Sequence, residues 1–218
     1  MAGSGAIAVR RVRRLWRYRE AAQIAAITVG VALLVKTFVA DAIHIPSLSM
    51  ERTVRAGDFL LVNKFVYGPA TPKFLPLTSI RIPRLHLPAL VSPRDGDVVV
   101  FRFPRADDAT VPQGELLVKR IVGVPGDRVE ARDGAILVNG RPVGIPDPDR
   151  GATPLPSFGP LEVPRDAYFV LGDNLPDSYD SRAWGCVPAD CLVGKAFIVY
   201  WSVGANGIRW SRIGTIVR

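Results

Sequence analysis

Few side chains in this 218-residue chain suit nucleophilic catalysis by a histidine or cysteine route. The chain has two histidines, His44, five residues before Ser49, and His86, inside a proline-rich segment. His44 lies where an apolar stretch ends, a position that needs no catalytic explanation. Cys186 and Cys191 have no adjacent histidine, which argues against a thiol protease. A Ser-His-Asp triad or a Cys-His pair is therefore not favoured.

A serine can instead be activated by a neutral lysine, if burial lowers the lysine pKa from about 10.4. Arginine cannot take this role, because it does not deprotonate in proteins. Lys119 shares a strand face with Leu117 and Ile121 by alternation, whereas Arg120 falls on the opposite face. Lys64 has a comparable apolar setting, so alternation alone does not decide which lysine would be the base. The full set of lysines is Lys36, Lys64, Lys73, Lys119 and Lys195.

Short apolar segments bounded by turn residues predict the strands that must position such side chains. Asp133-Gly134 and Asn139-Gly140 flank one segment in the manner of hairpin turns, which predicts a β-meander. Two proline-rich segments, 69–93 and 142–164, are expected to form long loops or a small inserted subdomain. The segments predicted as strands lie within residues 59–68, 95–103, 115–124, 135–140, 167–173 and 194–203.

An apolar stretch of 20 residues, 21–40, is long enough to cross a bilayer once as a helix of about 30 Å. Arginines crowd the sequence just before it, which predicts a cytoplasmic amino terminus. We therefore expect a basic cytoplasmic segment 1–20, a transmembrane anchor 21–42 and an extracytoplasmic domain 43–218. A cleaved secretory signal is the alternative, but the stretch exceeds the ~7–15 apolar residues of such signals.

The formal net charge of +8 does not indicate a nucleic-acid partner, because the excess arginines precede the apolar stretch. No zinc-knuckle, RNP-like or helix-turn-helix pattern accompanies the charge. Cys186 and Cys191 have a spacing that is unusual for zinc ligands. The sequence leaves open whether they form a disulfide or remain free thiols.

A series of short motifs beyond the apolar stretch resembles, in order, the sequence boxes of bacterial type I signal peptidases. The resemblance extends over most of residues 43–199, and a similar motif (IRWSRIG) follows at 208–214. The matching boxes are IPSLSM at 45–50, GDFLLVNKFVYG at 57–68, PRDGDVVVFRFP at 93–104, VKRIVGVPGDRV at 118–129 and GDNLPDSYDSRAWGCVP at 172–188.

The resemblance implies a catalytic role for three of these residues. Ser49 corresponds to the nucleophile, and Lys119, rather than Lys64, to its general base. Ser47 is implied to donate its hydroxyl to the oxyanion, alongside the backbone N–H of Ser49.

The last box implies supporting residues. Ser178 is expected to hydrogen-bond the lysine amine, and Asp180 and Arg182 to brace the site. The chain departs from many family members at residues 175–177, where Leu-Pro-Asp replaces Arg-Asp-Asn and leaves the local loop geometry in doubt.

The resemblance also implies a mostly β, antiparallel catalytic domain with a smaller inserted subdomain, and no metal or organic cofactor. The implied substrates are exported preproteins with small residues at positions −3 and −1. The apolar neighbours expected to line the substrate pockets are Ile45, Met50, Leu117 and Val118. Two alternatives are a Ser-Lys peptidase specialised for a conjugation or pilus precursor and an inactive, membrane-tethered β-domain that binds peptides.

Overall fold

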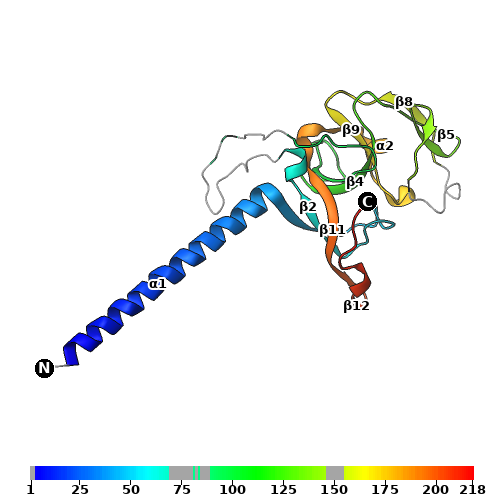
Figure 1. Cartoon of the computed structure of the whole chain (residues 1–218). Coiled ribbons are helices and arrows are strands. Elements are labelled where there is room, and N and C mark those ends of the chain that lie inside the picture. Colours follow the sequence, from blue (N-terminus) through cyan, green and yellow to red (C-terminus); the bar gives the residue numbers. More distant parts are fainter. Residues whose placement is uncertain (1–2, 69–80, 82, 84–88, 146–154) are drawn as a thin grey trace.

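The protein consists of a long helix joined to a β-rich body (Figure 1). The computed structural model describes residues 3–68, 81, 83, 89–145 and 155–218. The predicted loop 69–93 therefore lies mostly outside the described residues. The helical elements are α1 (Gly3–Leu34), the π-helix η1 (Val35–Val39), α2 (Ser181–Trp184) and the short 3₁₀ turns η2 (Phe65–Tyr67), η3 (Leu175–Asp177), η4 (Ala189–Cys191) and η5 (Trp210–Arg212).

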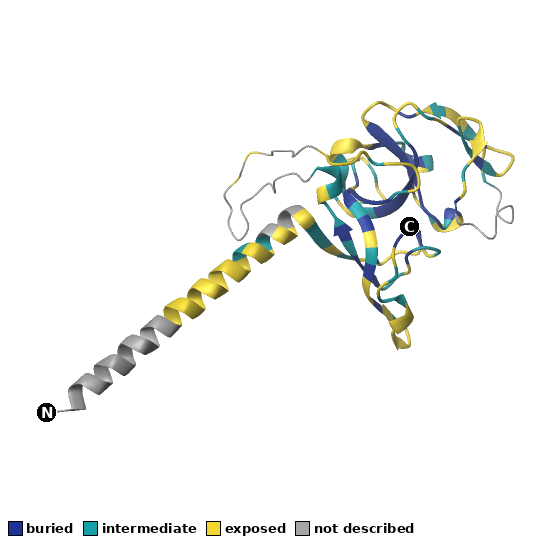
Figure 2. Ribbon diagram, in the orientation of Figure 1, coloured by how far each residue is buried: buried dark blue, intermediate teal, exposed yellow. Residues whose placement is uncertain are grey.

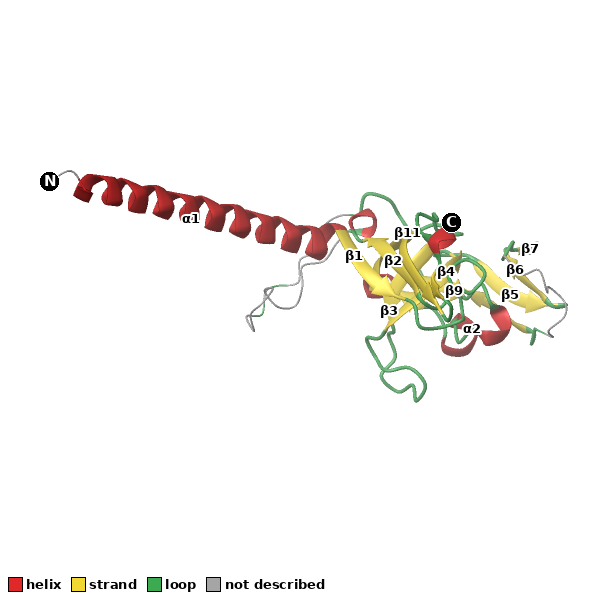
Figure 3. Cartoon of the chain, turned by 90° about the horizontal axis from the view of Figure 1, so that it is seen from below, coloured by secondary structure: helices red, strands yellow, loops and turns green. Residues whose placement is uncertain are grey.

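All described strand pairings are antiparallel, which confirms the mostly β, antiparallel fold. The larger sheet has the order β1-β2-β11-β3-β4-β9-β10, with β12 paired to β11. Figure 3 shows the labelled strands of this sheet grouped together beyond the end of helix α1. Its strands are β1 (Ala40–His44), β2 (Asp58–Asn63), β3 (Val98–Arg102), β4 (Leu116–Gly123), β9 (Ala167–Leu171), β10 (Val187–Pro188), β11 (Leu192–Gly204) and β12 (Gly207–Ile208).

Strand β4 is covered on both faces. Its last six residues are all buried, although they alternate between the two sides of the sheet. Val118 belongs to a core cluster with Val62 and Val100, whereas Ile121 packs with Phe101 in another. Figure 2 shows the buried strands in dark blue within the body, whereas the described residues of the helix are mostly exposed. The side chains in this part of β4, from Val118 on, are therefore desolvated on either face of the sheet.

A smaller sheet of order β7-β6-β5-β8 packs over its own apolar cluster. The predicted hairpin turns are confirmed: Asp133 and Asn139 adopt positive φ of 54° and 52°, each followed by a glycine that also has positive φ. Strands β5 and β8 were not predicted, and β8 lies within the second proline-rich segment. The strands are β5 (Arg128–Arg132), β6 (Ala135–Val138), β7 (Arg141–Pro142) and β8 (Phe158–Glu162).

Helix α1 and the π-helix η1 project away from the body (Figure 1). Ile24, Ile27 and Val31 are exposed on α1, and Val35 and Val39 on η1. Among the described residues, no helix combines the length and the mean hydropathy that a bilayer crossing requires. An anchor over residues 21–42 therefore stays a prediction.

A buried carboxylate fastens the C-terminal segment to the large sheet. Asp58 is fully buried and accepts hydrogen bonds from Ser202 Oγ at 2.6 Å and from the Arg212 guanidinium at 2.5 Å. Burial acts to raise the pKa of Asp58, but these hydrogen bonds outweigh it and hold the pKa below its usual value. The motif at 208–214 thus has a structural role, because Arg212 in η5 binds the buried carboxylate of Asp58.

Asp58→Asn should lower the free energy of unfolding at pH 7 by about 3 kcal/mol, because Arg212 loses its buried partner. A carboxylate whose pKa is lowered by folding contributes stability above its unfolded pKa of about 3.9, and that stability is lost as pH falls further. The deficit measured by urea unfolding should therefore shrink at pH 3. Asp107→Asn, which removes an exposed ion pair with Arg105, is the control and should change little. An equal deficit at both pH values would contradict this role for Asp58.

Candidate active site

Ser49 lies in a tight turn that follows β1. The N–H groups of Thr53 and Val54 both donate to the Met50 carbonyl, at 2.9 and 2.7 Å. Ile45, Met50 and Val54 are buried in the same core cluster, so apolar packing on both sides of Ser49 fixes the turn. Ser49 itself is only 7% exposed.

Lys119 reaches Ser49 from the middle of β4. Its Nζ lies 2.6 Å from Ser49 Oγ, although 70 residues separate the two in sequence. The side chain is 3% exposed. Burial lowers the pKa of Lys119 from its usual 10.5 to about 8. The charge of Asp180 raises this pKa and the charge of Arg182 lowers it, and both effects are smaller than that of burial. A serine and a lysine amine thus meet with part of the amine neutral at physiological pH.

The other lysine and histidine candidates have different surroundings. Lys64 Nζ donates to the Lys36 carbonyl at 3.0 Å and pairs with Asp41 at 2.9 Å. His44 is exposed and contacts the Phe59 ring in a tilted arrangement, with centroids 4.8 Å apart. His86 lies outside the described residues.

Ser47 and Ser178 flank the pair of Ser49 and Lys119. Ser47 is exposed, with its Oγ 3.4 Å from Ser49 Oγ. Ser178 Oγ is buried and has no hydrogen-bond partner in the described part of the chain, so its expected bond to the Lys119 amine stays a prediction. A Cβ on Gly172 would lie 2.2 Å from Ser178 Oγ and 2.5 Å from the Ser49 carbonyl oxygen. Only glycine at this position lets these segments approach so closely.

Asp180 and Arg182 brace the loop that carries Ser178. Asp180 is fully buried, caps α2 and accepts from the Gly172 N–H at 3.1 Å. Arg182 Nε donates to Asp180 at 2.7 Å, and its terminal nitrogen donates to the carbonyls of Leu175 and Ser178. Residues 175–177, which differ from the family pattern, form the 3₁₀ turn η3. This ion pair therefore holds both the divergent turn and the segment at Ser178.

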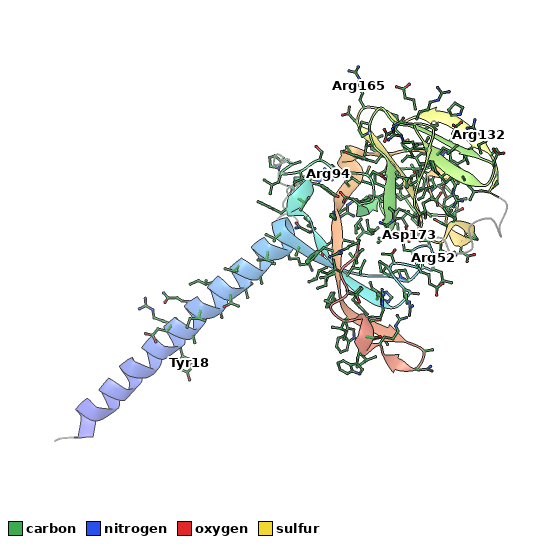
Figure 4. The ribbon with its side chains drawn as sticks, turned by 45° about the vertical axis from the view of Figure 1, so that its right-hand side comes forward. Tyr18, Arg52, Arg94, Arg132, Arg165 and Asp173 are labelled. Carbon is green, nitrogen blue, oxygen red and sulfur yellow. The ribbon has the colours of Figure 1, made fainter. Side chains whose placement is uncertain are left out.

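A second buried ion pair was missed by sequence reasoning. Arg120 donates twice to the Asp173 carboxylate, with both nitrogen–oxygen distances 2.7 Å, and once to the Gly96 carbonyl. Thr53, in the turn that carries Ser49, also hydrogen-bonds Asp173. The only signal in the sequence was Arg120 within an apolar run, because an arginine that becomes buried there needs a buried acid as its partner. Figure 4 shows Asp173 inside the body, whereas Tyr18 projects from the distant helix.

Asn174 was also missed, and it contacts the nucleophile turn directly. Its N–H donates to the Ser49 carbonyl at 3.0 Å, and its Nδ2 donates to the Leu48 carbonyl at 3.1 Å. The three residues 172–174 thus link the end of β9 to the turn, to β4 and to α2.

The four predicted pocket residues do not share one cluster. Ile45, Met50 and Val118 are buried together, whereas Leu117 packs with the cluster that contains Phe101. Adjacent residues of a strand point to opposite faces, which explains why Leu117 and Val118 separate. Leu48 and Leu116 are the more exposed apolar neighbours, at 49% and 39%.

The described residues contain no group of three or more His, Cys, Asp and Glu side chains that could hold a metal ion. Cys186 and Cys191 do not form a disulfide with each other. Cys186 packs against the cluster of the small sheet and Cys191 against the cluster that contains Trp184. Burial raises the pKa of the Cys186 thiol to about 11, so it is a poor nucleophile.

The sequence is similar to known proteins along most of its length. The family model described as "Signal peptidase, peptidase S26" matches residues 18–201. A probable signal peptidase I-2 of Synechocystis sp. is 36% identical and covers 81% of this chain and 70% of its own length. A signal peptidase I of Leptolyngbya laminosa is 36% identical, with coverage of 83% and 78%. A solved signal peptidase I from Enterococcus faecalis is 29% identical, with a TM-score of 0.41, and the match covers 49% of this chain and 98% of that chain. The chain belongs to the signal peptidase family, peptidase S26.

Proposed function

We propose that this protein is a serine endopeptidase that removes N-terminal signal peptides from exported preproteins with Ser49 and Lys119. The family membership supports the reaction class. The observation that carries the assignment is the 2.6 Å contact between a buried lysine amine and a serine hydroxyl. Any other base would have to displace Lys119 from Ser49 Oγ.

In the proposed mechanism, neutral Lys119 takes the proton of Ser49 Oγ while that oxygen attacks the scissile carbonyl. The Ser47 hydroxyl and the Ser49 N–H stabilise the oxyanion. Lys119 then gives the proton to the leaving amine, and an acyl-enzyme forms on Ser49. The leaving amine is the amino terminus of the mature protein, so the acyl-enzyme carries the signal peptide. Water, deprotonated by the same lysine, hydrolyses this acyl-enzyme and releases the signal peptide. Ser178, Asp180 and Arg182 hold Lys119 and its surroundings in place.

We propose that the substrate binds as an extended strand whose small residues at −3 and −1 face shallow apolar pockets. Ile45 and Met50 are almost fully buried, so they and Val118 would form the floor of a pocket. Leu117, on the other face of β4, would line a different one. Shallow pockets over packed side chains favour alanine and similar residues, because a larger side chain would overlap the floor.

We further propose that residues 21–42 attach the enzyme to the cell membrane as a single-pass anchor. Segment 1–20 would then lie in the cytoplasm and domain 43–218 outside. The exposed apolar side chains of α1 and η1 support attachment, because their contact with water is unfavourable and a bilayer would remove it. The arginines before residue 21 support the orientation. Ser49 would then work where the apolar segment of the preprotein also lies.

Ser49→Ala and Lys119→Met should each abolish cleavage of a preprotein that carries an Ala-x-Ala site. The first removes the attacking oxygen, and the second removes the base while keeping a buried apolar stem of similar length. The measurement is electrophoretic separation of precursor and mature protein in detergent, with thermal unfolding to verify that both variants are folded. Full activity of folded Lys119→Met would exclude Lys119 as the base. A wild type that binds but never cuts the preprotein would favour an inactive peptide-binding domain.

Ser47→Ala should reduce kcat by about 10²–10³ and leave KM little changed, because the hydroxyl acts on charge that develops in the transition state. Steady-state kinetics on a peptide spanning the cleavage site would measure both constants. Ser47→Thr keeps a hydroxyl and serves as the matched control. An unchanged kcat in Ser47→Ala would remove Ser47 from the oxyanion site.

The pH dependence of kcat/KM should report the deprotonation of Lys119. Only the neutral amine accepts the Ser49 proton, so the rate should rise about tenfold per pH unit below pH 8 and level off above it. The measurement is kcat/KM on a peptide without ionisable groups near the cleaved bond, from pH 6 to 10. A rate that continued to rise to pH 10 would show that Lys119 keeps an ordinary pKa.

A further inference from the structure

Lys64 connects the helix to the β body through three contacts. Its main-chain N–H donates to the Val39 carbonyl at 3.0 Å, and its Nζ donates to the Lys36 carbonyl at 3.0 Å. The same Nζ pairs with the Asp41 carboxylate at 2.9 Å. The Lys64 and Asp41 side chains are only 17% and 29% exposed, so this ion pair is partly shielded from water.

These contacts occur where the last carbonyls of a helix have no partner of their own. The carbonyls of a final helical turn need donors, and a cation is favourable at that end of the helix dipole. Lys64, which directly follows β2, supplies two N–H donors and a positive charge to this end of the helix. It therefore caps η1 from outside the helix.

The junction contains no free linker. η1 ends at Val39, and β1 begins at Ala40. Every residue of β1 is paired with β2, from Ala40 opposite Asn63 to His44 opposite Phe59. The direction of the helix is thus fixed relative to the sheet, with Lys64 next to the first pair of the ladder.

The same strand leads directly to the nucleophile. After β1, the N–H of Ile45 donates to the Asp58 carbonyl at 2.9 Å, and the Ile45 carbonyl accepts from the Gly57 N–H at 2.8 Å. Ile45 is buried, and Ser49 follows four residues later. A change in the angle of the helix would therefore move the whole body relative to the helix, while Ser49 keeps its contacts with Lys119 and Asn174 inside the body.

We propose that Lys64 is a positioning residue that sets how the catalytic body is held against the membrane. Its bonds to Asp41 and to the Lys36 carbonyl keep Ser49 at a fixed height above the apolar part of the helix. The substrate favoured by this arrangement is a preprotein whose own apolar segment lies in the same bilayer. The inference rests on the proposed function, and Lys64 touches none of the reacting atoms.

The test compares two substrates of full-length Lys64→Met in lipid vesicles. One is a preprotein with its apolar segment, reconstituted in the same vesicles, and the other is a soluble peptide with the same cleavage site. We expect kcat/KM for the membrane-embedded preprotein to fall about tenfold, since small misplacements of reacting groups are costly. Cleavage of the soluble peptide should stay within about twofold of wild type, as expected for a site distant from the change.

Three further variants sharpen the comparison. Asp41→Asn should show the same selective loss, and the double variant should lose little more, because both changes break one interaction. Lys195→Met is the matched control. Lys195 lies on the neighbouring strand β11, and the change removes its ion pair with Asp97. The ratio of the two activities in this variant should equal that of wild type.

Equal losses on both substrates would overturn the proposal, because Lys64 would then support only the fold. An undiminished rate on the embedded preprotein would overturn it as well. A wild type that cuts neither substrate would refute the proposed function itself. That outcome is distinguishable, because it appears without any substitution at the junction.

Discussion

Burial of the Lys119 amine beside Ser49 is the constraint on which the rest of the site depends. A lysine in water holds its proton far too tightly to act as a base at neutral pH. β4 removes that obstacle because packed side chains cover both of its faces, leaving Lys119 3% exposed. The same burial brings a cost, because a charged group in an apolar setting destabilises the fold unless it is neutral or paired. In Lys119 that cost is what lowers the pKa to about 8.

The buried acids near Lys119 are arranged so that they do not undo this effect. An unpaired carboxylate would hold the lysine in its charged form, and Asp180 does pull its pKa upward. Arg182, bonded to Asp180 at 2.7 Å, pushes the pKa of Lys119 the other way. Asp173, which also pulls the pKa of Lys119 upward, is paired with Arg120. Each acid can therefore brace the nucleophile turn through hydrogen bonds without acting as a free negative charge.

Much of the fold could be predicted because it depends on local signals. Apolar runs between turn residues located six strands, and the Asp-Gly and Asn-Gly pairs located two hairpin turns. Alternation of apolar and polar residues could not predict the burial of β4, because alternation marks one buried face and here both faces are covered. The Arg120–Asp173 pair depends on the register of β4 against β9, 53 residues apart. Strand β8 was hidden by the prolines and glycines around it, and it forms only because β5 offers an edge.

The direct test of the account is the ionisation of Lys119 itself, observed without turnover. With ¹³Cε-labelled lysine in Ser49→Ala and in wild type, NMR spectra recorded against pH would follow each amine, and the Lys119→Met spectrum would identify the Lys119 signal. We predict a midpoint of about 8 for Lys119 in the wild type, well below the usual 10.5. A midpoint near 10.5 would mean that the amine is charged beside Ser49, and Lys119 could not be the base.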